Sequence, residues 1–150
     1  MFRLTKKMRF ALEAVVDIAY NARPHPVQSR EITRRQGIPQ RYLEQVMQQL
    51  VHANILKGVR GPRGGYTLAR ERRRISVGEI IRVVGALENT PVAEAETCSP
   101  LGVQIIGPLW DEVQQEMMAR LDAISVEDLC ARARDVGIAP ESRRPADFNI

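Results

Sequence analysis

A short basic segment, RGPRGG at residues 60–65, lies between two apolar runs of the chain. Its Arg60 and Arg63 side chains could bind the backbone phosphates of a nucleic acid, because the guanidinium group matches phosphate geometry. Gly64 and Gly65 would keep the tip of such a loop narrow enough to enter a minor groove. The alternative is an ordinary surface hairpin whose charges serve solubility.

A second set of side chains suited to nucleic-acid binding falls on one face of a helix predicted over residues 39–53. Gln and Arg side chains can pair with adenine and guanine edges in the major groove. Most polar helix faces are merely solvated, and this is the alternative here. The candidates on this face are Gln40, Arg41, Gln45 and Gln48.

These two sets need elements that hold them on one surface. Gln28 or Ser29 opens a short helix, and Gly37 is placed to end it. Pro39 suits the first turn of the helix that follows. A short helix, a glycine-containing turn and a longer helix are typical of a helix-turn-helix.

The basic segment completes this unit. Apolar runs over residues 55–59 and 66–69 flank it, which predicts a hairpin with a longer loop. Thr5 can cap a further helix that begins the chain. Residues 1–87 are therefore predicted to form a winged helix-turn-helix DNA-binding domain, and the fold class is mostly α with a small β-hairpin wing.

The second half of the chain predicts a means of pairing two copies. Residues 88–103 have an irregular composition and are interpreted as a signal or regulatory loop, and residues 104–136 as dimerisation helices. The tail over 137–150 is expected to be loosely ordered, because it contains Pro, Arg and Ser residues without apolar periodicity.

The long helix of this half is expected to begin near Gly107, because Pro108 is accepted in a first turn but not in a helix interior. Its wide apolar stripe would form an isologous seam between two copies. The alternative is that the helix packs only on its own domain. The seam residues are Ile105, Ile106, Leu109, Trp110, Val113, Met117 and Leu121.

Composition narrows the class of protein. The net charge is +4 and unevenly distributed, with many cations in residues 57–74, which favours a polyanionic partner. Glu13 and Asp17 interrupt the apolar residues near the N-terminus, so neither a signal peptide nor a membrane helix is predicted. We expect a cytoplasmic protein that makes no contact with a membrane. No catalytic motif is found, so an enzyme is not expected.

Three stretches resemble a known family: RLTKKMRFALEAVVDIA, IPQRYLEQVMQQLVHANILKGVRGPRGGYTLAR and ISVGEIIRVVGALE. They are similar to the Rrf-two family of bacterial winged-helix regulators, the family of IscR, NsrR and CymR, and the resemblance covers about residues 3–135. It implies a homodimeric repressor on a palindromic operator, with helix 39–53 in the major groove and wing 60–66 in the minor groove. The implied DNA contacts are Gln28, Ser29, Arg41, Tyr42, Gln45, Arg60, Arg63 and Gly64.

The same resemblance bears on cofactors and partners. Cluster-binding members hold an iron–sulfur cluster with three cysteines in the loop that corresponds to residues 88–104, where this chain has only Cys98. Because a cluster needs about four ligands, no cofactor is expected. The segment LWDEVQQEMMARLDAISVEDL resembles the cluster-free CymR-like subgroup. That similarity implies control of sulfur or cysteine metabolism and, for some members, a partner enzyme such as cysteine synthase.

Two alternatives stay open. Cys98 could make the protein an iron–sulfur or redox-sensing regulator, because a lone thiol can form a disulfide or a sulfenic acid. The protein could instead be an interaction module that docks on a metabolic enzyme through residues 88–135. The second cysteine, Cys130, falls at helical spacing with apolar residues and is predicted to be a small buried hydrophobe.

Overall fold

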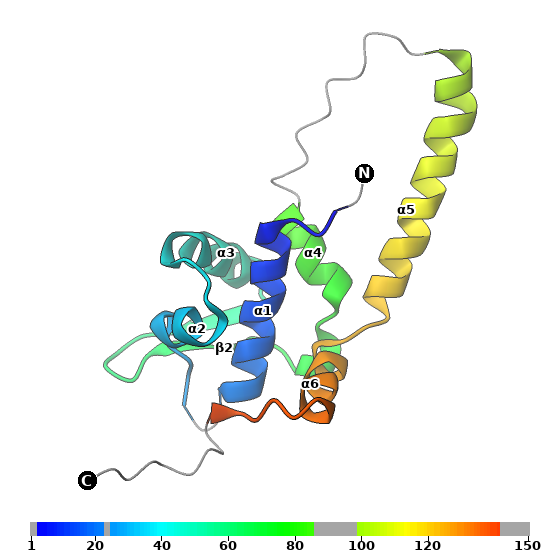
Figure 1. Cartoon of the computed structure of the whole chain (residues 1–150). Helices are drawn as coiled ribbons and strands as arrows, with labels where there is room; N and C mark the ends of the chain where they lie inside the picture. Colours follow the sequence, from blue (N-terminus) through cyan, green and yellow to red (C-terminus); the bar gives the residue numbers. More distant parts are fainter. Residues whose placement is uncertain (1–2, 23–24, 86–98, 142–150) are drawn as a thin grey trace.

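The structure is a computed structural model that describes residues 3–22, 25–85 and 99–141 of the chain. Figure 1 shows a helical body with a two-stranded hairpin and one long helix that projects from it. The elements in order are α1 (Lys6–Asn21), α2 (Ser29–Gln36), α3 (Gln40–His52), β1 (Leu56–Val59), β2 (Gly65–Leu68), the 3-10 helix η1 (Arg72–Arg74), α4 (Val77–Gly85), the π-helical turn η2 (Gly102–Ile106), α5 (Gly107–Asp122) and α6 (Val126–Asp135). The predicted fold class is confirmed.

Helix α1 is the centre of the body, and α2, α3, α4 and α6 pack around it. The helix begins where predicted, because the Thr5 hydroxyl accepts a hydrogen bond from the Met8 backbone N–H at 3.2 Å. Ala11, Ala14, Val15 and Ile18 of α1 are fully buried against residues of the surrounding helices. The core so formed fixes the orientation of α2 and α3. Its largest fully buried side chains include Ile18, Ile32, Ile38, Leu43, Met47 and Leu50.

The turn between α2 and α3 is set by three consecutive residues. Gly37 adopts φ +67°, a left-handed conformation that ends α2, and its N–H bonds to the Thr33 carbonyl at 2.9 Å. Ile38 is fully buried and ties the turn to the core. Pro39 directly precedes the first turn of α3, so the helix begins one residue later than predicted. The helix-turn-helix expected from the sequence is therefore present.

The hairpin is antiparallel, with Leu56 opposite Leu68 and Val59 opposite Gly65. Val27, in the loop before α2, extends it by one bridge. The Val27 N–H donates to the Tyr66 carbonyl at 3.0 Å, and the Tyr66 N–H donates to the Val27 carbonyl at 2.7 Å. These two bonds join the base of the wing to the start of the helix-turn-helix.

A second bridge holds the C-terminal half against the body. The Val77 N–H donates to the Ile124 carbonyl, and the Val126 N–H donates to the Ile75 carbonyl, both at 2.8 Å. Ser125 caps α6, and its hydroxyl accepts from the Asp128 N–H at 3.1 Å. The starts of α4 and α6 are thereby fixed together at the base of α5.

Helix α5 begins at Gly107 as predicted, but a helical turn directly precedes it. The Gly107 N–H bonds to the Gly102 carbonyl five residues earlier, which makes this turn π-helical. Pro108 has no N–H and its ring would clash with the carbonyl of an ordinary preceding turn, so the wider π-turn accommodates it. Pro108 thus lies in the first turn of α5 as predicted, whereas the π-helical turn before it was not predicted.

Residues 137–141, the first part of the tail that the sequence analysis expects to be loosely ordered, contact α1. Gly137, at φ +84°, turns the chain back toward α1 after α6. The Tyr20 hydroxyl then donates to the Ile138 carbonyl, and the Glu141 N–H donates to the Asn21 side chain at 2.8 Å. Long-range contacts order this segment although it has no periodic pattern. Residues 142–150 lie outside the described ranges.

Candidate nucleic-acid interface

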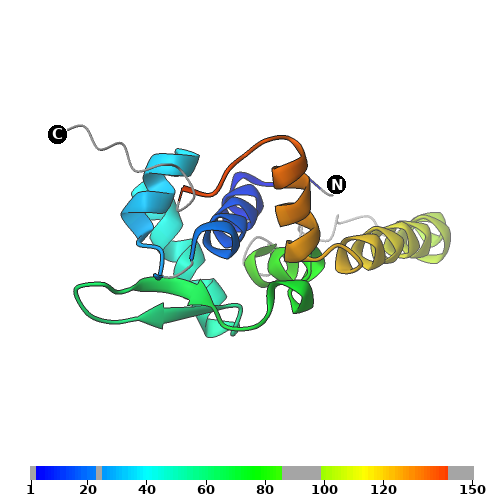
Figure 2. The same ribbon diagram turned by 90° about the horizontal axis from the view of Figure 1, so that it is seen from below.

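Helices α2 and α3 and the hairpin lie on one side of the molecule, and α5 projects from the other (Figures 1 and 2). Most of the side chains predicted to bind DNA therefore share one side. The sequence could not show this directly, because the Val27–Tyr66 bridge that joins the wing to α2 spans 39 positions of the chain.

Helix α3 turns Leu43, Val46, Met47 and Leu50 into the core and leaves its amide-rich face exposed. The Arg41, Gln45 and Gln48 side chains on that face make no hydrogen bond to any residue in the described ranges. Gln40 differs, because its amide nitrogen donates to Glu44 at 3.1 Å and its oxygen accepts from Thr33 at 3.1 Å.

Tyr42 is half exposed at the edge of the same face, and its ring centroid lies 6.1 Å from that of Phe10. The stack on α1 fixes the direction of the ring while leaving its outer part open to solvent. Tyr42 is thus positioned by the core and still accessible, as a DNA-contacting residue must be.

Gln28 and Ser29 lie at the N-terminus of α2. Gln28 precedes the first turn, and its backbone N–H donates to the Glu31 carboxylate at 2.8 Å. Its side-chain oxygen accepts from Arg30 at 2.8 Å. The N–H groups of a helix N-terminus attract a phosphate oxygen, so this end of α2 suits a backbone contact better than a base contact.

The wing tip depends on its glycines. Gly61 adopts φ +114°, which side chains rarely allow. A Cβ on Gly64 would collide with the Val59 carbonyl oxygen and approach that of Gly61 to 2.8 Å, and one on Gly65 would collide with Val27. Gly64 and Gly65 thus permit the close backbone approach that keeps the hairpin thin and docked.

The cations near the wing divide into two groups. Arg70, Arg72 and Arg73 form ion pairs with Glu79, Glu127 and Glu71, and Arg70 also donates to the Asn54 carbonyl at 3.1 Å. Arg70 thereby joins the base of the wing to α4, and Arg72 joins η1 to α6, whereas the Arg73–Glu71 pair is local and exposed. By contrast, Lys57, Arg60 and Arg63 are exposed and form no ion pair within the described ranges. Within the hairpin, Lys57 on β1 and Arg60 and Arg63 at the tip are therefore available to a phosphate.

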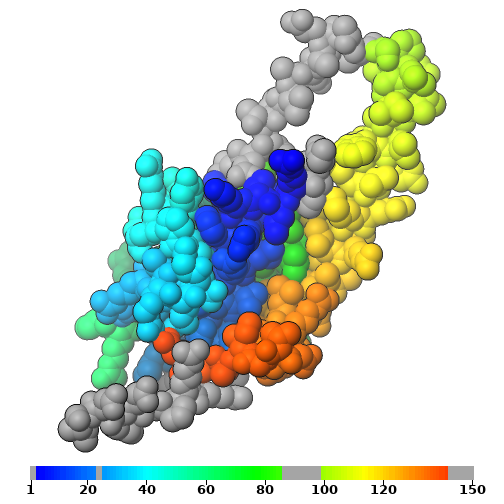
Figure 3. Space-filling model, in the orientation of Figure 1, coloured from blue at the N-terminus to red at the C-terminus, as the bar shows by residue number. Residues whose placement is uncertain are grey.

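The predicted seam residues lie along η2 and α5, which together project from the body as an arm (Figure 3). Ile105, Ile106, Leu109, Trp110 and Val113 are between 47% and 57% exposed. Met117 is partly buried, and Leu121 packs against a small cluster formed by Met8, Val77 and Ile81. The C-terminal end of the stripe therefore contributes to the chain's own core, and its N-terminal end is exposed.

The base of α5 is held firmly against α4. Arg82 donates to both oxygens of Asp122, at 2.6 and 2.7 Å, and this contact holds the pKa of Asp122 below its ordinary value. Gly78 allows the close approach, because a Cβ there would collide with the Asp122 side chain. The arm is thus set at a defined angle by its first contacts with the body.

The described residues do not fit an iron–sulfur cluster. No three His, Cys, Asp or Glu side chains within residues 3–22, 25–85 and 99–141 converge on a common point. Cys130 is fully buried in the core as predicted, and this burial raises the pKa of its thiol. A raised pKa disfavours the thiolate that a cluster requires. Cys98, with residues 88–98 of the predicted loop, lies outside the described ranges.

Known proteins share both the sequence and the fold. A family model described as "Rrf2: Iron-dependent Transcriptional regulator" matches residues 4–132. The HTH-type transcriptional regulator IscR of Xenorhabdus nematophila is 34% identical over 138 residues, which cover 91% of this chain and 84% of that protein.

Solved structures agree with this match. The structure of T. potens IscR has a TM-score of 0.74 at 32% identity and covers 94% of this chain and 95% of that one. The structure of CymR, described as the global cysteine regulator of B. subtilis, has a TM-score of 0.71 at 29% identity and covers 88% and 98%. In the described part of this chain, no helix is long and apolar enough to cross a bilayer.

Proposed function

The chain belongs to the Rrf2 family of transcriptional regulators, and from this premise we propose that it is a homodimeric repressor that reads a palindromic operator in the cytoplasm. Membership of this family makes it a DNA-binding regulator and not an enzyme. The observation that supports the finer proposal most is the shared exposure of Arg41, Gln45 and Gln48 on α3, beside a basic wing tip that forms no ion pair with any described residue.

In the proposed complex, the amide-rich face of α3 enters the major groove. Gln45 and Arg41 have the donors and acceptors to read adenine and guanine edges. Gln28 and Ser29 contact the phosphate backbone at the α2 N-terminus, and the wing over residues 60–66 lies in the minor groove. Two such units, related by the dyad of a dimer, would read the two halves of a palindrome.

We expect replacement of Arg63 by alanine to weaken binding to all DNA sequences similarly and to lower the slope of log affinity against log salt by about 1. The reason is that an unpaired guanidinium at the wing tip releases one counterion per phosphate contact. Fluorescence anisotropy over a salt series measures both quantities. Arg132→Ala, which removes an equal charge from an exposed position on α6, is the matched control. An Arg63→Ala slope equal to that of the control would contradict the wing contact.

Replacement of Gln45 by alanine is expected to relax base preference at one operator position in each half-site. The loss of a bidentate amide contact costs about 1–3 kcal/mol at that position. Selection of bound sequences from a random DNA library, for both proteins, gives the two preference profiles. Gln115→Ala on α5 should leave the profile unchanged. Identical profiles for wild type and Gln45→Ala would place the base readout elsewhere.

We further propose that the protein works without an iron–sulfur cluster and that it regulates sulfur or cysteine metabolism. The sequence holds two cysteines, and one of them is buried in the core. The proposal that it regulates sulfur or cysteine metabolism rests on the similarity to the cysteine regulator CymR. None of the relatives reported above is named together with an enzyme partner, so no cysteine synthase partner is proposed.

Anaerobic purification followed by an absorption spectrum and an iron assay tests the absence of a cluster. We expect a colourless, iron-free protein that still binds DNA. A brown protein with iron close to one cluster per protomer would overturn this part of the proposal, while leaving the DNA interface intact. The ligand candidates would then be Cys98, the exposed His25 and His52, and carboxylates.

A further inference from the structure

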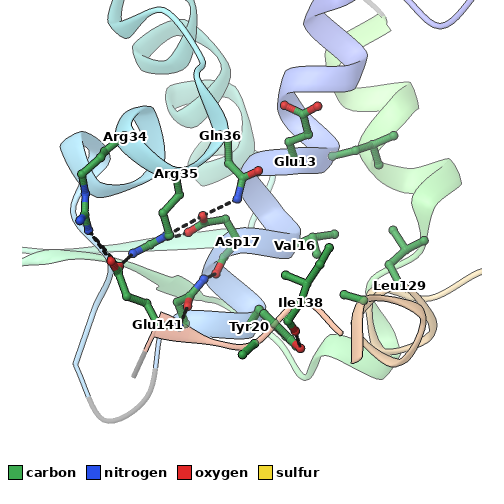
Figure 4. A pocket seen from close by; sticks show the side chains of 14 residues that line it. Glu13, Val16, Asp17, Tyr20, Arg34, Arg35, Gln36, Leu129, Ile138 and Glu141 are labelled. Carbon is green, nitrogen blue, oxygen red and sulfur yellow. Dashed lines mark hydrogen bonds and ion pairs between the residues drawn. The ribbon is translucent and has the colours of Figure 1, made fainter. Parts of the chain in front are cut away.

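A cavity of about 700 Å³ lies between α1, α2, α6 and the segment that follows α6 (Figure 4). It is separate from the exposed faces of α3 and the wing. One wall is apolar and includes Leu12, Val16 and Leu129. The opposite wall is polar and includes Arg34 and Arg35 of α2. The cavity therefore combines an apolar surface with a cationic one.

The cationic wall is built and rigid. Arg35 donates two hydrogen bonds to Asp17, at 2.9 and 2.7 Å, and the Asp17 side chain is fully buried. Gln36 donates to the same carboxylate at 2.8 Å. These contacts fix the guanidinium plane of Arg35 and leave Nη1, which does not bond to Asp17, on the side of Glu141. Arg34, one residue earlier, is 63% exposed at the rim.

A carboxylate from the same chain already fills the space between the two arginines. Glu141 accepts hydrogen bonds from Arg34 at 2.7 and 2.9 Å and a further one from Arg35. Partial burial alone would raise the pKa of Glu141, but the bonds and charges of the two arginines hold it below its ordinary value. The Glu141 carboxylate is therefore ionised at neutral pH and occupies the anion position between the two arginines.

Glu141 differs from Asp17 in how firmly the fold holds it. Its side chain is 32% exposed, and it belongs to the segment that follows α6, whereas Asp17 belongs to α1. The two arginines and the two carboxylates balance in charge. If a carboxylate from solution replaced the Glu141 carboxylate, the charges would still balance. If it bound beside Glu141 instead, the site would carry an excess negative charge.

We propose that this cavity binds a small monocarboxylate with an apolar body, whose carboxylate replaces Glu141 between Arg34 and Arg35. The apolar body lies against Leu12, Val16 and Leu129. Glu141 acts as an internal competitor that occupies the anion position when no ligand is bound. The site lies on α2, the first helix of the helix-turn-helix, at the end opposite Gln28 and Ser29.

Titration of the ¹⁵N-labelled full chain with hexanoate, followed by NMR, tests this site directly. Hexanoate provides one carboxylate and a five-carbon apolar chain, and hexanamide is its neutral counterpart. We expect saturable shifts at the amides of Tyr20, Arg35 and Leu129 with a Kd on the order of 1 mM, as befits a ligand of this size. Hexanamide should bind at least about tenfold more weakly, because it lacks the charge-assisted bonds.

The variant Glu141→Gln distinguishes a binding site from a simple intramolecular contact. Removal of the competitor should tighten hexanoate binding about tenfold, because a larger fraction of the protein is then competent to bind. The variant Arg34→Gln, at an exposed position that preserves the fold, should weaken hexanoate binding to the level of hexanamide. Circular dichroism confirms that both variants are folded.

The proposal would be overturned if hexanoate caused no saturable shift in either the wild type or Glu141→Gln. It would also be overturned if hexanamide and hexanoate bound equally well, or if the wild type and Glu141→Gln had the same affinity for hexanoate. The titration contains no DNA, so its outcome is independent of the proposed operator binding.

Discussion

Replacement of Asp17 by alanine is expected to lower the free energy of unfolding by about 3 kcal/mol, the cost of leaving one partner of a buried ion pair without its counter-charge. The Asp17 carboxylate is fully buried and accepts three hydrogen bonds, two from Arg35 and one from Gln36. Arg35 keeps Glu141 as a partner in the variant, so the loss falls at the lower end of the range for broken buried pairs.

Urea denaturation followed by circular dichroism, at one fixed protein concentration, measures this loss. Glu13→Ala is the matched control, since Glu13 lies one turn earlier on α1 and pairs at 2.9 Å with exposed Arg9. An exposed pair of this kind contributes about 0.5 kcal/mol or less. If Asp17→Ala were no more destabilising than this control, the buried network would contribute nothing to stability.

A double variant separates the charge from the packing. Asp17→Ala combined with Arg35→Met removes both buried charges and keeps an apolar side chain of similar length at position 35. Because no charge is then left unpaired, we expect the double variant to be more stable than Asp17→Ala alone. A further loss of stability would show that the arginine acts through contacts other than this pair.

Replacement of Trp110 by aspartate is expected to weaken the proposed dimer by about 100-fold or more. Trp110 lies in the middle of the exposed apolar stripe of α5, and large aromatic residues at the centre of an interface dominate its affinity. The substitution places a charge at the seam, and the two-fold symmetry of the dimer introduces it twice. The stripe projects from the body, so the protomer should keep its fold.

Sedimentation equilibrium over a range of protein concentrations gives the dimer dissociation constant. Gln115→Asp adds the same charge to the same helix, and helical spacing places it away from the stripe, so its dimer should persist. Trp110 is the single tryptophan of the chain, so its fluorescence in the wild type should shift to the blue as the protein is concentrated. A Trp110→Asp protein that remains a tight dimer would place the seam on another surface.

Local patterns predicted most of the helical boundaries well. Thr5 and Gly37 act at the helix ends where the sequence placed them, because caps and left-handed stops depend on a few neighbouring backbone groups. The hairpin followed from its glycines for the same reason. The π-turn before Gly107 was missed, because the sequence does not show whether a turn before a proline stays helical.

The sequence also contained a signal of the buried network that its interpretation did not use. Asp17 falls among apolar residues on the inward face of α1, and a charge in that position needs a partner. The partner could not be identified, because Arg35 lies 18 residues away in the chain. The pattern indicated that a counter-charge must exist but not which residue supplies it.

The sequence by itself determined the winged helix-turn-helix and the identity of the side chains that could bind DNA, since these depend on short-range spacing and residue type. Only the tertiary structure decided which arginines are available. Arg70 and Arg72 are paired with glutamates brought to them by the fold, whereas Arg60 and Arg63 remain unpaired at the wing tip within the described ranges. The physical reason is that ion pairing depends on distance in space, and residues far apart in the chain become neighbours only when the core packs.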